Sequence, residues 1–106
     1  MKLSEGRGIY DLCKKLWPIT RSITGVGVRE TLKIIQQEIP NLTIHEVPTG
    51  TQCFDWKIPK EWNIKSAYII DPNGKIIIDF RDNNLHVVSY SVPINKTVSL
   101  SELQHH

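Results

Sequence analysis

Residues 67–80 read AYIIDPNGKIIIDF, two apolar runs on either side of Asp71-Pro72-Asn73-Gly74. Proline suits the second position of a type I turn, asparagine suits the third, and glycine takes the left-handed conformation that closes a hairpin with a bulge. The stretch therefore predicts an antiparallel β-hairpin. A polar turn at residues 81–84 leads into residues 85–92, which are predicted to add a third strand and make a meander.

Two further segments upstream of this hairpin have the pattern of strands. Residues 42–47 alternate apolar and polar side chains, which predicts a half-buried strand. Residues 53–59 alternate again and place Phe54, Trp56 and Ile58 on one face, where we expect Trp56 to be buried. Together the segments predict a mainly antiparallel sheet of four or five strands.

The first part of the chain is helical in pattern. One apolar stripe at helical spacing ends at Pro18 and consists of Ile9, Leu12, Cys13, Leu16 and Trp17. A second stripe predicts a helix over residues 26–39 with Thr24 as its N-cap; its members are Val28, Leu32, Ile35 and Ile39. Two helices striped on one side should pack on each other or on the sheet, so we predict an α+β fold.

The bulk composition excludes some classes of function. The 106 residues suit one domain, and the net charge of +2 comes from 13 basic and 11 acidic residues that are interleaved. This pattern indicates neither a nucleic-acid-binding surface nor a membrane-surface patch. No apolar window approaches the roughly 20 residues of a membrane span, so we expect a cytoplasmic protein. Cys13 and Cys53 are expected to be buried free thiols, with a disulfide between them as the alternative.

A helix start stands close to the end of the sequence. Ser99-Leu100-Ser101-Glu102 has the pattern of a capping box, in which serine and glutamate side chains bond the first free amides of a helix. A helix of so few residues gains little by itself, because nucleation is costly. We interpret the box as the beginning of an element that continues in a longer polypeptide.

The residues that usually carry catalysis are scattered. The four histidines, at positions 45, 86, 105 and 106, lack metal-binding spacing with any other ligand, and no serine stands in a GxSxG motif. Pairs of carboxylates such as Asp79 and Asp82 lie at expected turns, where solvated side chains and caps are common. We therefore predict no metal site, cofactor or catalytic residue within this chain.

Two stretches remain as candidate contact surfaces. Arg21, Ser22 and Thr24 stand before the second helix and could hold an anion together with its first amides. In the structural alternative, Arg21 bonds carbonyls at the end of the first helix, and Gly25 and Gly27 allow the two helices to approach each other closely. The second stretch carries Asp55, Trp56, Glu61 and Trp62, and Trp62 in its loop is a candidate exposed anchor for a sugar or a protein.

Several runs of the sequence resemble one bacterial family. They include residues 9–12, 16–25 and 28–32, then His45-Glu46-Val47-Pro48, residues 50–52 and 54–56, residues 59–64, and residues 84–88 with 90–93. These runs resemble sequences of the aminopeptidase-like proteins associated with polysaccharide biosynthesis. Proteins of that family resemble zinc aminopeptidases and carry an inserted β-rich domain of unknown function.

The resemblance implies a division of the chain. Residues 1–50 would begin the aminopeptidase-like domain, and residues 51–106 would form the first part of the inserted domain. In such proteins the metal ligands follow the insert, so zinc is implied only for a full-length parent, and no catalytic residue is carried over. The resemblance thus implies a fragment that is not catalytically competent alone and whose partner is the remainder of the parent chain. The alternative is a non-catalytic binding or oligomerisation module with a carbohydrate or protein partner, including a homodimer through sheet edges.

Overall fold

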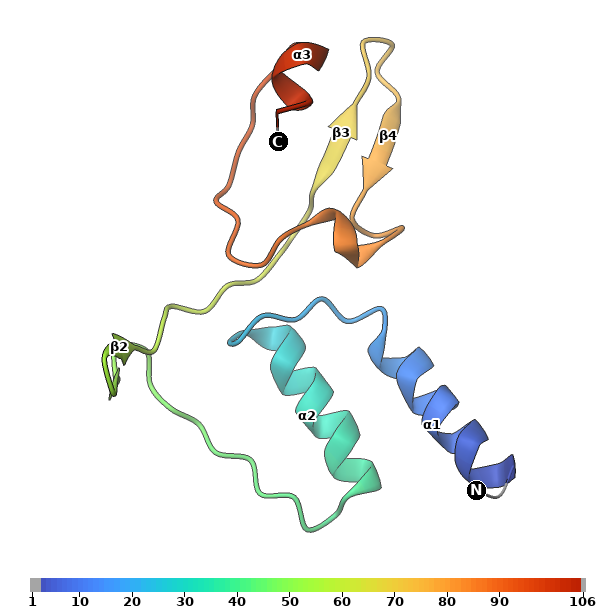
Figure 1. Cartoon of the computed structure of the whole chain (residues 1–106), viewed down its shortest axis with the longest axis vertical. Coiled ribbons are helices and arrows are strands. Elements are labelled where there is room, and N and C mark those ends of the chain that lie inside the picture. Colours follow the sequence, from blue (N-terminus) through green and yellow to red (C-terminus); the bar gives the residue numbers. More distant parts are fainter. Residues whose placement is uncertain (1–2, 106) are drawn as a thin grey trace.

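The computed structural model describes residues 3–105, and its elements are spread over an open arrangement (Figure 1). Two α-helices come first, α1 (Leu3–Leu16) and α2 (Val26–Glu38). Four short strands follow: β1 (Gln52–Cys53), β2 (Trp56–Lys57), β3 (Tyr68–Ile70) and β4 (Ile76–Asp79). The 3-10 helix η1 (Asn84–His86) and the short helix α3 (Leu100–Leu103) complete the described chain. The predicted α+β class is confirmed.

Both predicted N-terminal helices form. α1 ends just before Pro18, and its last turn is closed by the Trp17 amide, which donates to the Cys13 carbonyl at 2.9 Å. α2 begins at Val26, but the N-cap is Gly25 and has no side-chain cap bond. The prediction that Thr24 caps α2 is therefore wrong, because the Thr24 hydroxyl bonds elsewhere in the fold.

The hairpin of residues 67–80 has the features that its sequence predicts. β3 and β4 pair antiparallel, with an irregularity of register between Ile69 and Ile70. Gly74 has φ 83°, a left-handed conformation that glycine adopts without steric cost. The Asp71 carboxylate fixes the turn by accepting the Asn73 and Lys75 amides, each at 2.9 Å.

Residues 53–59 do not form one strand, which corrects the prediction for this segment. Phe54 takes φ 52° and reverses the chain, so that β1 and β2 become the arms of a second small hairpin. Phe54 is 95% exposed and Trp56 is 44% exposed. The expectation that Trp56 is buried is therefore also wrong, because the predicted apolar face is interrupted by the turn.

The other two predicted strands are absent from the described residues. Residues 42–47 form no strand. The backbone groups of residues 43–47 make no hydrogen bond to another backbone group. Residues 85–92 begin instead as η1, because the Asn83 carboxamide accepts the Leu85 amide at 3.0 Å and starts a helical turn. The predicted meander is thus wrong, and the strands form two separate two-stranded sheets.

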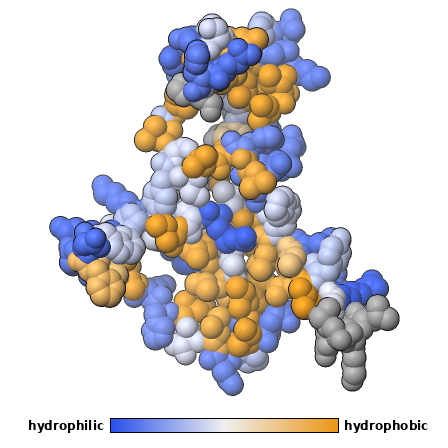
Figure 2. All heavy atoms as spheres, in the orientation of Figure 1, coloured by the Kyte–Doolittle hydropathy of each residue, from blue (hydrophilic) through white to orange (hydrophobic). Residues whose placement is uncertain are grey.

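Among residues 6–105 no shared apolar core joins these elements. No hydrophobic side chain in this range is buried, and the three buried residues are Gly25, Thr31 and Asp79. The radius of gyration is 18.3 Å, whereas a compact chain of this length would have about 13 Å. Figure 2 shows apolar side chains lying open on the visible face around α2. Both cysteines are free, but Cys13 is exposed and Cys53 is partly exposed, so the expectation of buried thiols is wrong.

The predicted capping box is confirmed. The Ser99 hydroxyl accepts the Glu102 amide at 3.2 Å, and the Glu102 carboxylate accepts the Ser99 amide at 2.8 Å. The Ser99 amide, and after it the Ser99 hydroxyl, lower the pKa of Glu102 by donating to its carboxylate and stabilising the charged form. The helix that they start has four residues and no buried side chain.

We expect the isolated chain to unfold on heating without a cooperative transition, because no apolar side chain of residues 6–105 is completely removed from water by folding. Scanning calorimetry and near-ultraviolet circular dichroism measure this directly. A sharp calorimetric peak with an enthalpy near about 0.7 kcal/mol per residue would contradict the expectation.

Candidate functional site

Three segments that are distant in the sequence meet beside the start of α2. They are residues 20–25 between the two helices, residues 60–63 after the β1–β2 hairpin, and residues 89–91 after η1. We call this meeting point the junction. It includes five of the seven predicted site residues, namely Arg21, Ser22, Thr24, Glu61 and Trp62.

Arg21 connects the end of α1 to α2 and to residue 89. Its guanidinium donates to the Leu16 carbonyl at 2.7 Å and lies 3.4 Å from the Thr31 hydroxyl on α2. Its own carbonyl accepts the Ser89 hydroxyl at 3.1 Å. A cation at the C-terminus of a helix also interacts favourably with the helix dipole. The structural alternative for Arg21, a bond to the end of the first helix, is confirmed.

Thr24 and Trp62 connect the interhelical loop to residues 90 and 91. The Thr24 and Tyr90 hydroxyls lie 2.8 Å apart, and the Trp62 indole N–H donates to the Ser91 carbonyl at 2.9 Å. The Trp62 and Tyr90 rings are 6.2 Å apart between centroids. Trp62 is only partly exposed. Its ring lies beside Tyr90 and its indole N–H is bonded to Ser91, so both already have partners within the chain.

Asn63 supplies the cap that Thr24 does not. Its side-chain oxygen accepts the Val26 amide, the first N–H of α2, at 2.7 Å. Such an amide has no partner within the helix and needs an external acceptor. With this amide and Arg21 both engaged inside the chain, the arrangement favours a structural role for the loop over the predicted anion site.

The two glycines of the loop are needed for this contact. Gly25 has φ 114°, and an added Cβ would lie 2.6 Å from the Trp62 carbonyl oxygen. At Gly27 an added Cβ would lie 2.0 Å from the Thr20 carbonyl oxygen. The glycines thus bring backbone against backbone, although at Gly27 the neighbour is the loop rather than the first helix.

An ion pair closes the outer side of the junction. The Arg29 guanidinium donates to both Glu61 carboxylate oxygens, at 2.5 Å and 3.0 Å. These hydrogen bonds lower the pKa of Glu61 and raise the pKa of Arg29, against a smaller opposing effect of desolvation. Both side chains are nearly half exposed, so the pair orients the segments more than it stabilises them.

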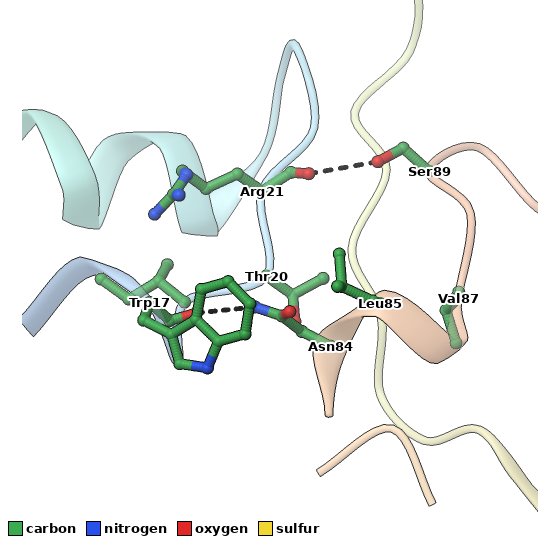
Figure 3. Close-up of a pocket in the computed structure, with 8 residues that line it drawn as sticks. Trp17, Thr20, Arg21, Asn84, Leu85, Val87 and Ser89 are labelled. Atoms are coloured by element: carbon green, nitrogen blue, oxygen red, sulfur yellow. Dashed lines mark hydrogen bonds between the residues drawn. The ribbon is translucent and has the colours of Figure 1, made fainter. Parts of the chain in front are cut away.

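Two open cavities flank the junction. The larger, of about 430 Å³, lies between the interhelical loop and residues 62–64, with Glu30, Val26 and Phe80 also in its wall. The smaller, of about 240 Å³, lies between the end of α1 and η1 (Figure 3). In it the Asn84 carboxamide donates to the Trp17 carbonyl at 2.6 Å and the Arg21 carbonyl faces Ser89. Neither wall contains a histidine or a cysteine.

The structure separates Asp55 and Trp56 from the other predicted residues. Both lie on the β1–β2 hairpin, apart from the junction in Figure 1. Conversely, sequence reasoning missed Asn63, Tyr90 and Ser91 as members of the junction. Their partners are 37, 66 and 29 residues away, so no local pattern could have identified them.

The described residues do not fit a resident metal ion. Among residues 3–105, no three His, Cys, Asp or Glu side chains form a group that could hold one, and His106 lies outside this range. The helices within the same range include none with the length and apolar character needed to cross a membrane.

Comparisons with known proteins place the chain in a family. Residues 10–103 match the family described as "Domain of unknown function (DUF4910)". A Clostridium acetobutylicum protein named "Putative polysaccharide biosynthesis protein with aminopeptidase-like domain" is 59% identical over 99 residues. The match falls in the N-terminal part of that relative and covers 93% of this chain and 23% of the relative.

A solved structure gives the same correspondence. The crystal structure of a "putative peptidase" from Clostridium acetobutylicum matches with a TM-score of 0.88 and 57% sequence identity. The match covers 96% of this chain and 24% of that one, so this chain spans about a quarter of each relative's length. These findings confirm the resemblance seen in the sequence: the chain belongs to the DUF4910 family and corresponds to the N-terminal part of an aminopeptidase-like protein.

Proposed function

We propose that this chain is a structural, non-catalytic portion of an aminopeptidase-like protein, and that the remainder of such a protein covers its apolar surface. The observation that carries the proposal is the lack of any buried hydrophobic side chain among residues 6–105. Exposed large apolar side chains such as Ile9, Trp17 and Val92 are 58%, 59% and 80% exposed. Apolar surface on this scale is typical of an interface rather than of a free-standing domain.

The proposed domain boundary near residue 50 assigns a role to the junction. Residues 1–50 would begin the aminopeptidase-like domain, and residues 51–106 would begin the inserted β-rich domain. The bonds Val26–Asn63, Arg29–Glu61 and Thr24–Tyr90 all cross this boundary. In the proposal, the junction therefore fixes the orientation of the insert against the helices.

Residues 42–47 would receive their partner from the same remainder. Leu42 and Ile44 are partly covered while Thr43 and His45 are exposed, the alternation of a strand with one covered face. Backbone groups that form no bond here would pair with a strand of the remaining protein.

Zinc and hydrolase activity belong, in this proposal, to the part of the aminopeptidase-like protein outside this chain. The role of the described residues is to orient the remaining part of that protein and to cover its contacting surface. Two free cysteines favour a reducing compartment, so we propose a cytoplasmic location. A second proposal is a homodimer through sheet edges, since each two-stranded sheet among residues 3–105 has outer edges without a partner strand.

A chimera tests the structural role. In it, this chain replaces the matching N-terminal region of the Clostridium acetobutylicum relative. We expect the chimera to unfold in a cooperative transition, because the remaining relative covers the apolar side chains that the isolated chain leaves open. Circular dichroism and calorimetry measure the transition, with the relative lacking that region as control. A chimera that melts as broadly as the isolated chain would refute the proposed function.

The lack of catalysis has its own test. We expect the purified chain with added zinc to release no product from aminoacyl p-nitroanilides above a zinc-only blank, because no described group of side chains can hold the ion. Turnover that grows in proportion to chain concentration, and survives repurification, would overturn this expectation.

The role of Asn63 is tested in the same chimera. Asn63→Ala removes the acceptor of the first α2 amide, and lost caps cost about 0.5–2 kcal/mol. We expect a lower melting temperature for Asn63→Ala and near-normal melting for Asn63→Asp, which keeps an oxygen at the helix N-terminus. Asn95→Ala, at an exposed position, is the control variant. Equal melting of Asn63→Ala and Asn95→Ala would show that the cap contributes nothing.

A further inference from the structure

The β1–β2 hairpin displays an unusually open aromatic side chain at its tip. Phe54 is 95% exposed, the largest exposed fraction among the large hydrophobic residues described. Trp56 beside it is 44% exposed, and the polar residues Gln52, Asp55 and Lys57 surround them. An apolar centre with a polar rim is the arrangement of residues that dominate protein interfaces.

The backbone of Phe54 is in a conformation that its side chain does not favour. Its φ of 52° lies in the left-handed region, whereas the following residue, Asp55, is not among those with positive φ. A bulky side chain in this region costs roughly 1–2 kcal/mol relative to glycine. A tip that served only to reverse the chain would be better formed by glycine, so the phenylalanine requires another explanation.

The rest of the hairpin is well formed, so the position of Phe54 is not that of a loose end. The Gly50 amide donates to the Ile58 carbonyl at 2.8 Å, and the Ile58 amide donates to the Thr51 carbonyl at 2.9 Å. The Gln52 carboxamide donates to the Phe54 carbonyl at 2.7 Å and holds the turn itself. The hairpin therefore holds the backbone of Phe54 in place, which lowers the entropy lost when a partner binds.

We infer that Phe54 is the anchor residue of a contact between this hairpin and the remaining part of the aminopeptidase-like protein, where its ring enters an apolar socket. The inference rests on the proposed function and names the residue that would make the contact. The length of the relatives favours this occupant, because about three quarters of each lies outside the match. A second copy is less suitable, because insertion of a tip into a different surface is a head-to-tail contact that does not close on itself.

The chimera with Phe54→Gly tests the inference through the sign of its effect. Glycine relieves the positive φ and removes the ring. If the tip were free in the assembled protein, the variant would melt at the same temperature or higher. With the ring in a socket, we expect the melting temperature to fall by about 2–4 °C, because the loss of the buried aromatic exceeds the relief of strain.

The controls separate the remaining explanations. Asp55→Ala, at the neighbouring exposed position, should shift the melting temperature by less than about 1 °C, as exposed substitutions usually do. Phe54→Leu keeps an apolar group and should recover part of the loss. Unchanged or raised melting of Phe54→Gly would overturn the inference and leave the proposed function intact. A chimera of unaltered sequence that does not fold cooperatively would refute both.

Light scattering identifies the occupant. We expect the chimera and its Phe54→Gly variant to have the same molecular mass in solution. If the variant instead converts a dimer into a monomer, the socket lies on a second copy and the inference about the remaining chain is wrong.

Discussion

Polar bonds at the junction, rather than an apolar core, connect the helical part of this chain to its hairpins. Asn63 accepts the first amide of α2, Thr24 meets the Tyr90 hydroxyl, and Trp62 donates to the Ser91 carbonyl. Each of these bonds joins segments that are at least 29 residues apart. Because water competes for exposed hydrogen bonds, such contacts contribute little net stability and mainly determine geometry. The junction bonds therefore define how the helices and hairpins are arranged, but they do not by themselves stabilise the folded chain.

The features that the sequence predicted are those encoded within a few neighbouring residues. Asp71-Pro72-Asn73-Gly74 forms its turn through bonds among residues 71–75, and Ser99 and Glu102 form their box within one helical turn. The bond from Arg21 to Leu16 spans five residues and was also within reach of sequence reasoning. In each case the cause and its effect lie in the same short stretch.

The failures concern partners that a local pattern cannot specify. Alternation in residues 42–47 indicates which face of a strand would be covered, but a strand also needs a neighbour, and these residues have none among residues 3–105. Thr24 has the chemistry of an N-cap, yet Tyr90 binds its hydroxyl and Asn63 takes its place. Aromatic residues at positions 54 and 56 favour a strand by intrinsic propensity. The chain nevertheless reverses at Phe54, and β propensity, which depends on the packing of neighbouring strands, does not predict this reversal.

The uncovered apolar surface and the conformation of Phe54 lead to one physical conclusion. A chain that exposes its hydrophobic residues gains free energy only when a second surface removes them from water. A strained backbone at an exposed tip is likewise tolerated only when a contact offsets its cost. Both conditions are met if the junction orients the helices and the hairpins while the apolar surfaces are covered, so that the uncovered faces and the Phe54 ring contact the rest of an aminopeptidase-like protein together.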